Sequence, residues 1–164
     1  MANQRAIAPC LWFDTQAEEA AKLYVSIFDD SKIERVAHYT KAGFATHGRP
    51  AGSVMTVSFR LRGSPMTALN GGPHFKFNEA ISLQVPCDSQ QEIDHHWNAL
   101  VKGGAEQQCG WLKDKFGVSW QIVPSVLDQM LRDEDEAKVE RVTNTFLQMK
   151  KFDIAALERA YSSK

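Results

Sequence analysis

The first candidates for a functional site are Trp111, Lys113 and Asp114. They lie in the run Trp-Leu-Lys-Asp, which places an aromatic ring and two opposite charges where a predicted strand reaches its turn. An aromatic ring can stack on a ligand while the polar groups orient it. The same run also suits a structural turn, with Asp114 accepting from backbone amides and Lys113 in solvent. Asn70 offers a similar choice, because its carboxamide could cap a turn or point into a binding site.

The cysteines and histidines form no motif that would place a nucleophile or a metal ion. Cys10, Cys87 and Cys109 are far apart, odd in number and without a CxxC spacing, which favours a reducing compartment over a disulfide framework. His95 and His96 are adjacent on a predicted polar helix, where neighbours do not face each other, so we expect a surface pair. The other histidines, which we expect to be exposed, are His38, His47 and His74.

The composition is that of an ordinary globular protein. Of the 164 residues 43% are hydrophobic and 24% charged, and the formal net charge is -1. This balance gives no electrostatic reason to expect nucleic acid or an anionic membrane as a partner. The apolar run Ile7 to Phe13 is too short for a membrane span and lacks a cleavage site, so it predicts a buried strand instead of a signal peptide. We therefore expect a cytoplasmic protein.

A repeated unit of apolar run, capping box and helix organises the chain. The runs Asp14 to Glu18 and Asp88 to Glu92 each follow an apolar segment, 74 residues apart. Thr15 with Glu18, and Ser89 with Glu92, match the capping box that opens a helix. Apolar residues at helical spacing follow each box: Ala17, Ala20, Tyr24 and Ile27 in the first helix, and Ile93, Trp97 and Leu100 in the second.

Three strand-like segments follow each helix, so each half is predicted to be a βαβββ module. The segments are 32–39, 54–61 and 65–69 in the first half, and 105–109, 111–115 and 119–123 in the second. Arg62-Gly63-Ser64 and Phe116-Gly117-Val118 are expected to turn the chain between strands. The long loop from Lys41 to Gly52 is rich in Gly and Pro and is expected to be mobile or lid-like.

The expected fold class is α+β, with two cupped mixed sheets and C-terminal helices. Module one spans residues 1–73, module two 79–124, and a helical extension 125–164, all within one domain. The expected C-terminal helices are Ser125 to Leu131, Asp135 to Lys150 and Asp153 to Tyr161. Cupped modules leave sheet edges that need pairing, so we expect a homodimer. The helical stripe that could pack across its interface is Val139, Val142, Phe146 and Met149.

Several segments resemble a known family, and together they span nearly the whole chain. They are Leu11 to Asp14 leading into Ala17 to Ala20, Ala68 to Pro73, Cys109 to Gln121 and Met149 to Ile154. The chain resembles the vicinal oxygen chelate (glyoxalase, bleomycin resistance, dioxygenase) superfamily, in its PhnB-like branch. That branch often carries the label 3-demethylubiquinone-9 3-methyltransferase. We do not expect methyl transfer, because the paired glycines Gly71-Gly72 and Gly103-Gly104 do not lie between a strand and a helix.

The resemblance also implies where a metal ion would bind. Metal-dependent members take one His, Glu or Gln ligand from the first and last strand of each module. The matching positions here are Ala8, Thr67, Ser82 and Gln121. Cys10 and Gln84 lie two residues further along the first strands and share those faces. These side chains carry no formal charge to offset the dehydration of a divalent ion, so we expect neither a metal nor another cofactor.

The leading functional expectation is a protein that binds a small, partly aromatic molecule in an apolar cup without metal, as the drug-resistance members of the superfamily do. Two alternatives remain open: an isomerase, lyase or dioxygenase with a different set of metal ligands, and a regulatory or interaction module that uses the C-terminal helices. The residues expected to line the cup are Cys10, Trp12, Thr67, Asn70, Ser82, Gln84, Trp111, Lys113, Asp114 and Gln121.

Overall fold

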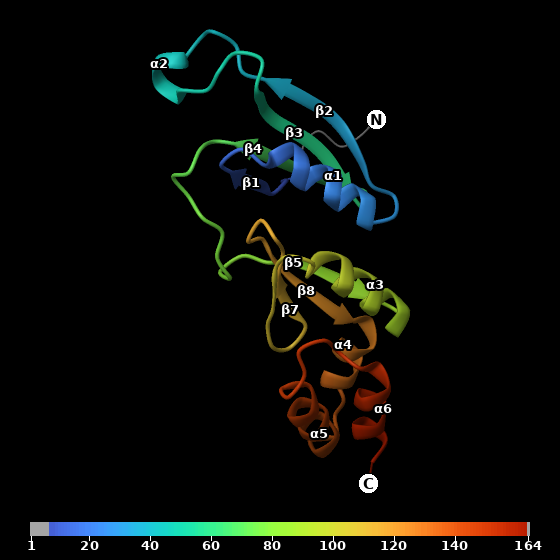
Figure 1. Ribbon diagram of the computed structural model, residues 1–164. Helices are drawn as coiled ribbons and strands as arrows, with labels where there is room; N and C mark the ends of the chain where they lie inside the picture. The colour runs from blue at the N-terminus through green and yellow to red at the C-terminus, as the bar shows by residue number, and fades with distance from the viewer. Residues whose placement is uncertain (1–6, 164) are drawn as a thin grey trace. The chain divides into compact units, whose positions relative to one another are not determined.

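The computed structural model describes residues 7–163, which form an α+β fold (Figure 1). The chain divides into two compact units, Met1–Phe77 and Asn78–Lys164. Each unit contains a four-stranded mixed sheet with a helix packed against it, which confirms the two predicted βαβββ modules. That the two units form a single domain stays a prediction.

The first unit has the strand order β1-β4-β3-β2. Strand β1 runs parallel to β4, and the other neighbours are antiparallel. Its elements are β1 (Cys10–Phe13), α1 (Ala17–Ile27), β2 (Lys32–His38), α2 (Phe44–His47), β3 (Val54–Leu61) and β4 (Ser64–Asn70). The short helix α2 lies in the loop between β2 and β3, beyond the end of the sheet (Figure 1).

The core of the first unit lies between α1 and one face of the sheet. All four residues of the predicted helical stripe are buried, and the Tyr24 ring lies 6.4 Å from the Phe59 ring of β3. Alternate residues of the central strands, Val57 and Phe59 of β3 and Ala68 of β4, are fully buried on this face. Burial of one large apolar side chain stabilises the fold by roughly 1.5–3 kcal/mol, so this face holds the module together.

The beginning of the first unit differs from the sequence prediction in two ways. The strand starts only at Cys10, where the register with β4 begins, and Ile7 is fully exposed. The predicted Thr15–Glu18 capping box is also wrong. Helix α1 begins after Gln16 without a local side-chain cap, because the Asn70 side chain from β4 accepts a hydrogen bond from Ala17 N at 2.8 Å instead.

The second unit repeats the arrangement with the strand order β5-β8-β7-β6. Its predicted cap is confirmed at Ser89, whose Oγ accepts from Glu92 N at 3.2 Å. The Glu92 carboxylate accepts from Asp88 N at 2.8 Å, one residue before the N-cap. The predicted stripe of Ile93, Trp97 and Leu100 is buried against the sheet. The elements are β5 (Leu83–Cys87), α3 (Gln90–Leu100), β6 (Ala105–Glu106), β7 (Trp111–Lys113) and β8 (Ser119–Pro124).

Strand β6 is shorter than the predicted segment 105–109. Cys109 and Gly110 both have left-handed backbone angles, with φ of 57° and 79°, which turns the chain out of the strand. Their amides donate to the backbone oxygens of Met149 and Lys150, each at 2.7 Å. The C-terminal segment thus binds the backbone where β6 would have continued.

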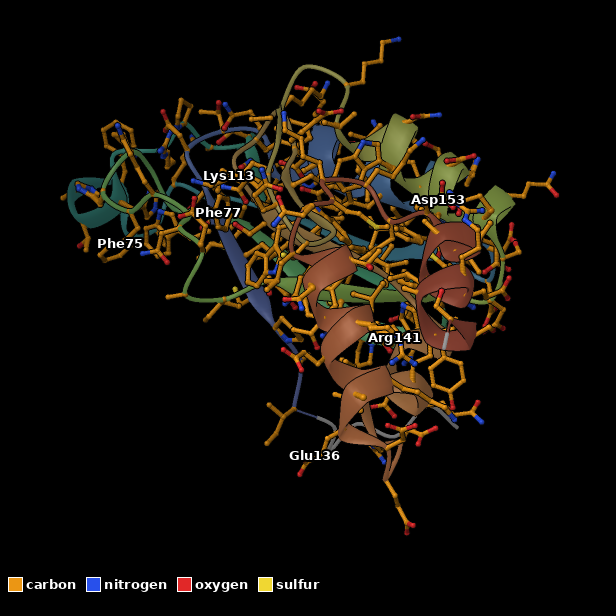
Figure 2. The ribbon with its side chains drawn as sticks, turned by 90° about the horizontal axis from the view of Figure 1, so that it is seen from below. Phe75, Phe77, Lys113, Glu136, Arg141 and Asp153 are labelled. Atoms are coloured by element: carbon orange, nitrogen blue, oxygen red, sulfur yellow. The ribbon has the colours of Figure 1, made fainter. Side chains whose placement is uncertain are left out.

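The C-terminal helices are attached to the second unit. They are α4 (Ser125–Leu131), α5 (Glu136–Phe146) and α6 (Ile154–Ser162). The predicted end of α5 at Lys150 is four residues too late. Helices α5 and α6 lie side by side (Figure 2), and Arg141 Nε donates to Ala160 O at 3.1 Å. Of the stripe suggested for a dimer interface, Val142 is buried within this unit and the other members are half-buried.

None of the helices between residues 7 and 163 has the length and apolar character needed to cross a membrane.

Candidate functional site

The candidate binding surfaces are the faces of the two sheets turned away from α1 and α3, here called the open faces. Strand residues alternate between the two sides, so the side chains next to each buried residue point to the open face. On the first sheet Cys10 lies beside Thr67, which lies beside Ser58. Trp12 lies beside Leu69 in the next row. The predicted residues Cys10, Trp12 and Thr67 therefore share one surface.

Cys10 has no feature of an activated nucleophile. Its side chain is exposed. Partial burial of the sulfur nevertheless raises the pKa of the thiol above its ordinary value. A raised pKa favours the neutral thiol, whereas nucleophilic attack requires the thiolate.

Trp12 is held rigidly on the open face of the first sheet. Its indole Nε1 donates to Gly72 O at 2.9 Å, and the Phe75 ring meets it edge-on at 4.9 Å. A side chain at Gly71 would come within 2.2 Å of the indole, so only glycine allows this packing. Figure 2 shows Phe75 and Phe77 on the segment that follows β4; Phe75 is 65% exposed.

Asn70 has a folding role. It is buried, its Oδ1 accepts from Ala17 N, and its Nδ2 donates to Val54 O at 3.0 Å. Its backbone oxygen accepts from the Tyr39 hydroxyl at 2.7 Å. These bonds connect α1, β3 and β4, so the carboxamide is used to close the module.

On the open face of the second sheet, one row of side chains crosses β5, β8 and β7. Gln84 of β5 is paired with Gln121 of β8, and Gln121 with Trp111 of β7. Gln107 continues the row beyond β6, because its amide donates to Trp111 O at 2.9 Å. Gln107 was not among the residues predicted for the site. Its neighbour is Trp111, and the turn at Cys109 and Gly110 that brings the two together was not predicted from the sequence.

The glutamines of this row are joined to each other and to Ser82. Gln121 Nε2 donates to Ser82 Oγ at 2.7 Å, and Gln84 Nε2 donates to Gln121 Oε1 at 3.4 Å. Gln84 is exposed and Gln121 is half-buried. The result is a neutral polar strip beside the Trp111 ring.

Lys113 lies one row away from Trp111 and forms an ion pair with Glu79 at 2.6 Å. Glu79 also accepts from Gln107 Nε2 at 3.0 Å. The hydrogen bond from Lys113 lowers the pKa of Glu79 below its ordinary value, and the bond from Gln107 lowers it further. Glu79 thus stays ionised and neutralises Lys113. No local pattern in the sequence marked Glu79 as a partner.

Asp114 forms the turn that precedes β8. One carboxylate oxygen accepts from Phe116 N and Val118 N at 2.9 and 3.0 Å, and the other accepts from Trp120 Nε1 at 2.9 Å. The side chain is 3% exposed. Asp114 therefore has the structural role of the two considered: its carboxylate holds the turn and does not face a ligand.

The adjacent histidines do not form a surface pair. His96 is buried and lies 2.7 Å through Nδ1 from Glu92 O, whereas His95 is exposed. Cys87, also buried, has its sulfur 3.8 Å from the same ring nitrogen. Since a carbonyl oxygen can only accept, Nδ1 carries the proton and cannot act as a base toward Cys87. His38 and His74 are exposed as expected, and His47 is half-buried against Tyr39.

The side chains at the predicted metal positions do not fit a divalent ion. Thr67 is paired with Cys10 and not with Ala8, and Gln121 is surrounded by Ser82 and Gln84. These donors are hydroxyl, thiol and amide groups, without the carboxylate or imidazole that such ions prefer. Within residues 7–163 there is no group of three or more His, Cys, Asp or Glu side chains arranged to hold a metal.

The connections between strand and helix do not fit S-adenosylmethionine. Residues 14–16 and 88–89 join β1 to α1 and β5 to α3, and neither connection contains a glycine. A nucleotide-like cofactor usually approaches the backbone at a Gly-rich turn of this kind. Gly71-Gly72 follow β4 and pack against Trp12 instead.

Comparison with known proteins identifies relatives for the two modules. Residues 5–123 match the model of the family described as 3-demethylubiquinone-9 3-methyltransferase. A putative 3-demethylubiquinone-9 3-methyltransferase, PhnB protein, from Bacillus cereus is 32% identical, with a TM-score of 0.66. The match covers 74% of this chain and 100% of that protein. No curated protein matches the sequence.

More distant solved structures resemble the fold. A protein from Pseudomonas aeruginosa is 22% identical, with a TM-score of 0.57, and the match covers 72% of this chain and 96% of that one. A glyoxylase/bleomycin resistance protein/dioxygenase domain from Frankia sp. EAN1pec also matches, with 15% identity and a TM-score of 0.43, over 73% of this chain and 90% of that chain. The family match ends at residue 123, before helix α4 begins.

Proposed function

The chain belongs to the 3-demethylubiquinone-9 3-methyltransferase family, and we propose that it binds a small, partly aromatic molecule without a metal ion. The observation that carries this proposal is the row on the second sheet, where Trp111 lies beside Gln121. Ligand sites usually combine aromatic surface with a few fixed polar groups. Trp111 supplies the first, and the hydrogen-bonded strip of Ser82, Gln84 and Gln121 supplies the second.

The first sheet supports the same proposal with a second aromatic surface. Trp12 lies beside Leu69 and is fixed by Gly72 and Phe75. Thr67 and Cys10 add small polar groups to this face. A rigid aromatic side chain loses little conformational entropy when a ligand stacks on it, so Trp12 suits a binding role.

Methyl transfer, which the family description suggests, is not part of the proposal. The strand–helix connections lack the glycines that would admit a nucleotide-like cofactor, as described above. The proposal likewise includes no metal-assisted step, because the donor set at the metal positions is neutral.

A thermal-shift screen against a collection of small aromatic compounds tests the proposal, with elemental analysis of the same purified protein. A ligand at about one hundred times its dissociation constant stabilises the fold by about 2.7 kcal/mol, which corresponds to several degrees in Tm. Compounds that raise the Tm of the wild type should not raise the Tm of the Trp111→Ala variant. The control variant Phe44→Ala, which removes a 55% exposed aromatic ring of α2, should respond like the wild type.

Stabilisation by divalent ions alone, with a stoichiometric metal in the elemental analysis, would contradict this function.

We also propose a homodimer, with the end of α5 and the turn that follows it as one part of its interface. Phe146 and Met149 are half-buried and Leu147 is 50% exposed, so apolar surface remains available there. Sedimentation at micromolar concentration should give twice the chain mass of 18.4 kDa. A mass equal to one chain would contradict the dimer.

A further inference from the structure

We propose that the open face of the second sheet selects neutral, flat heteroaromatic molecules that carry an N–H donor next to a carbonyl acceptor, as in a cyclic amide. This inference rests on the proposed binding function and names its ligand class. Three features of the face support it: the position of an aromatic ring, the hydrogen-bonding capacity of two carboxamides, and the pairing of the neighbouring charges of Lys113 and Glu79.

The position of Trp111 sets the shape of the ligand. Trp111 and Gln121 are directly paired on antiparallel strands, where side chains on one face lie close enough to touch a common group. Leu112, the next residue along β7, is fully buried on the helix side, so the half-buried indole belongs to the open face. A flat ring stacked on this indole would bring its edge to the glutamines of the neighbouring strands.

The two carboxamides set the pattern of donors and acceptors. A carboxamide has two N–H donors and an oxygen that accepts two hydrogen bonds. Gln121 uses one donor toward Ser82 and one acceptor position toward Gln84. It therefore keeps one N–H donor and one acceptor position for a ligand. Gln84 is exposed and keeps its own oxygen and a second N–H. This is the pairing by which a carboxamide reads the adjacent donor and acceptor of a planar base.

The neighbouring charges disfavour an anionic ligand. Lys113 is the cation one row from Trp111, and Glu79 neutralises it at 2.6 Å. An anionic ligand would have to displace Glu79 from Lys113 and Gln107, and would gain only the contacts that Glu79 loses. Gln107 Nε2 donates to Glu79, and the Gln107 oxygen is buried and without a hydrogen-bond partner among the described residues, so neither atom is exposed to a ligand as the Gln84 and Gln121 carboxamides are. The groups left for the ligand are neutral.

Three probes of matched size test the inference by calorimetric titration of the full chain. Carbostyril is a bicyclic cyclic amide with both donor and acceptor, N-methylcarbostyril lacks the donor, and quinaldate is an anion. We expect carbostyril to bind roughly tenfold more tightly than either of the others, since a site built around hydrogen bonds discriminates against a ligand that leaves its groups unpaired.

Gln121→Leu should remove most of this preference while N-methylcarbostyril still binds. Gln84→Leu, at an exposed position, is the second variant if Gln121→Leu fails to fold. Gln148→Leu exchanges an exposed glutamine outside the row and should keep the wild-type preference.

Two results would overturn the inference and leave the proposed function standing. One is equal binding of the three probes, or tightest binding of quinaldate. The other is failure of all three probes when a compound from the thermal-shift screen binds through Trp111. If no aromatic compound of any kind binds, the proposed function fails together with the inference.

Discussion

Gln84 and Gln121 lie directly beside each other on the parallel strands β5 and β8, with Gln84 Nε2 3.4 Å from Gln121 Oε1. The first module places Cys10 beside Thr67 in the same way. Both modules thus keep a facing pair on the first and last strand, and each pair is neutral. The two modules thus place equivalent pairs at the same positions of the sheet, and the groups of both pairs suit hydrogen bonds better than metal coordination.

The two predicted capping boxes should respond differently to mutation. Ser89 accepts a hydrogen bond from Glu92 N, so Ser89→Ala should lower the free energy of unfolding by about 1 kcal/mol. Thr15 is not the N-cap of α1, so Thr15→Ala should change the free energy of unfolding by less than about 0.5 kcal/mol. Urea unfolding of both variants measures the difference. Equal losses would show that Thr15 caps α1 after all.

Asn70 should be the more sensitive residue at the start of α1. Asn70→Ala removes an acceptor from Ala17 N and a donor to Val54 O inside the core, and should cost about 2–4 kcal/mol. Asn144→Ala, at an exposed site in α5, is the matched control and should be close to neutral. A calorimetric melt of each variant gives the comparison. If Asn70→Ala lowered the free energy of unfolding as little as the control does, the hydrogen bonds of Asn70 would make no net contribution to stability.

Gln90 should anchor the C-terminal helices to α3. Its Nε2 donates to Phe152 O at 3.0 Å and its Oε1 accepts from Ile154 N at 2.9 Å. Gln90→Ala should cost about 1–3 kcal/mol and speed amide exchange in α6. The neighbouring exposed residue provides the control Gln91→Ala. Unchanged exchange in α6 would contradict an anchoring role.

The Glu79–Lys113 ion pair predicts a pH dependence of stability. The pKa of Glu79 is lowered in the folded protein, chiefly by the hydrogen bond from Lys113. The ionised carboxylate therefore stabilises the fold above its unfolded pKa of about 4.3, and this contribution is lost as the pH falls through the folded pKa. The wild type should exceed Glu79→Gln in unfolding free energy at neutral pH, and the difference should vanish in acid.

Glu158→Gln, on the exposed side of α6, controls for the removal of one charge. A difference between wild type and Glu79→Gln that grows as the pH falls would contradict the assigned sign.

The modules could be predicted from sequence because their signals are periodic. Alternating strand residues and the buried stripes, such as Ile93 with Trp97, specify which side of each element meets the core. The register between strands is not a local property. The sequence placed Ala8 with Thr67 among the four metal positions, whereas pairing in the sheet puts Cys10 beside Thr67.

The candidate site was harder to predict, because the role of a polar side chain depends on partners distant in sequence. Asn70 and Asp114 have residue types that suit a binding site, but their acceptors are taken by Ala17 N and Trp120 Nε1. His96 lies on a polar helix, yet it is buried because its position in α3 faces the sheet. Glu79 belongs to the site only because it forms an ion pair with Lys113, which is distant from it in sequence.

Titration with carbostyril after dialysis against EDTA, repeated with added Mn²⁺ and Zn²⁺, tests metal-independent binding most directly. If Trp111 and Gln121 hold the ligand through stacking and neutral hydrogen bonds, the Kd should be the same in all samples. Binding that disappears with EDTA and returns with one of these ions would contradict the account, because the ligand would then depend on a metal that these side chains were inferred not to hold.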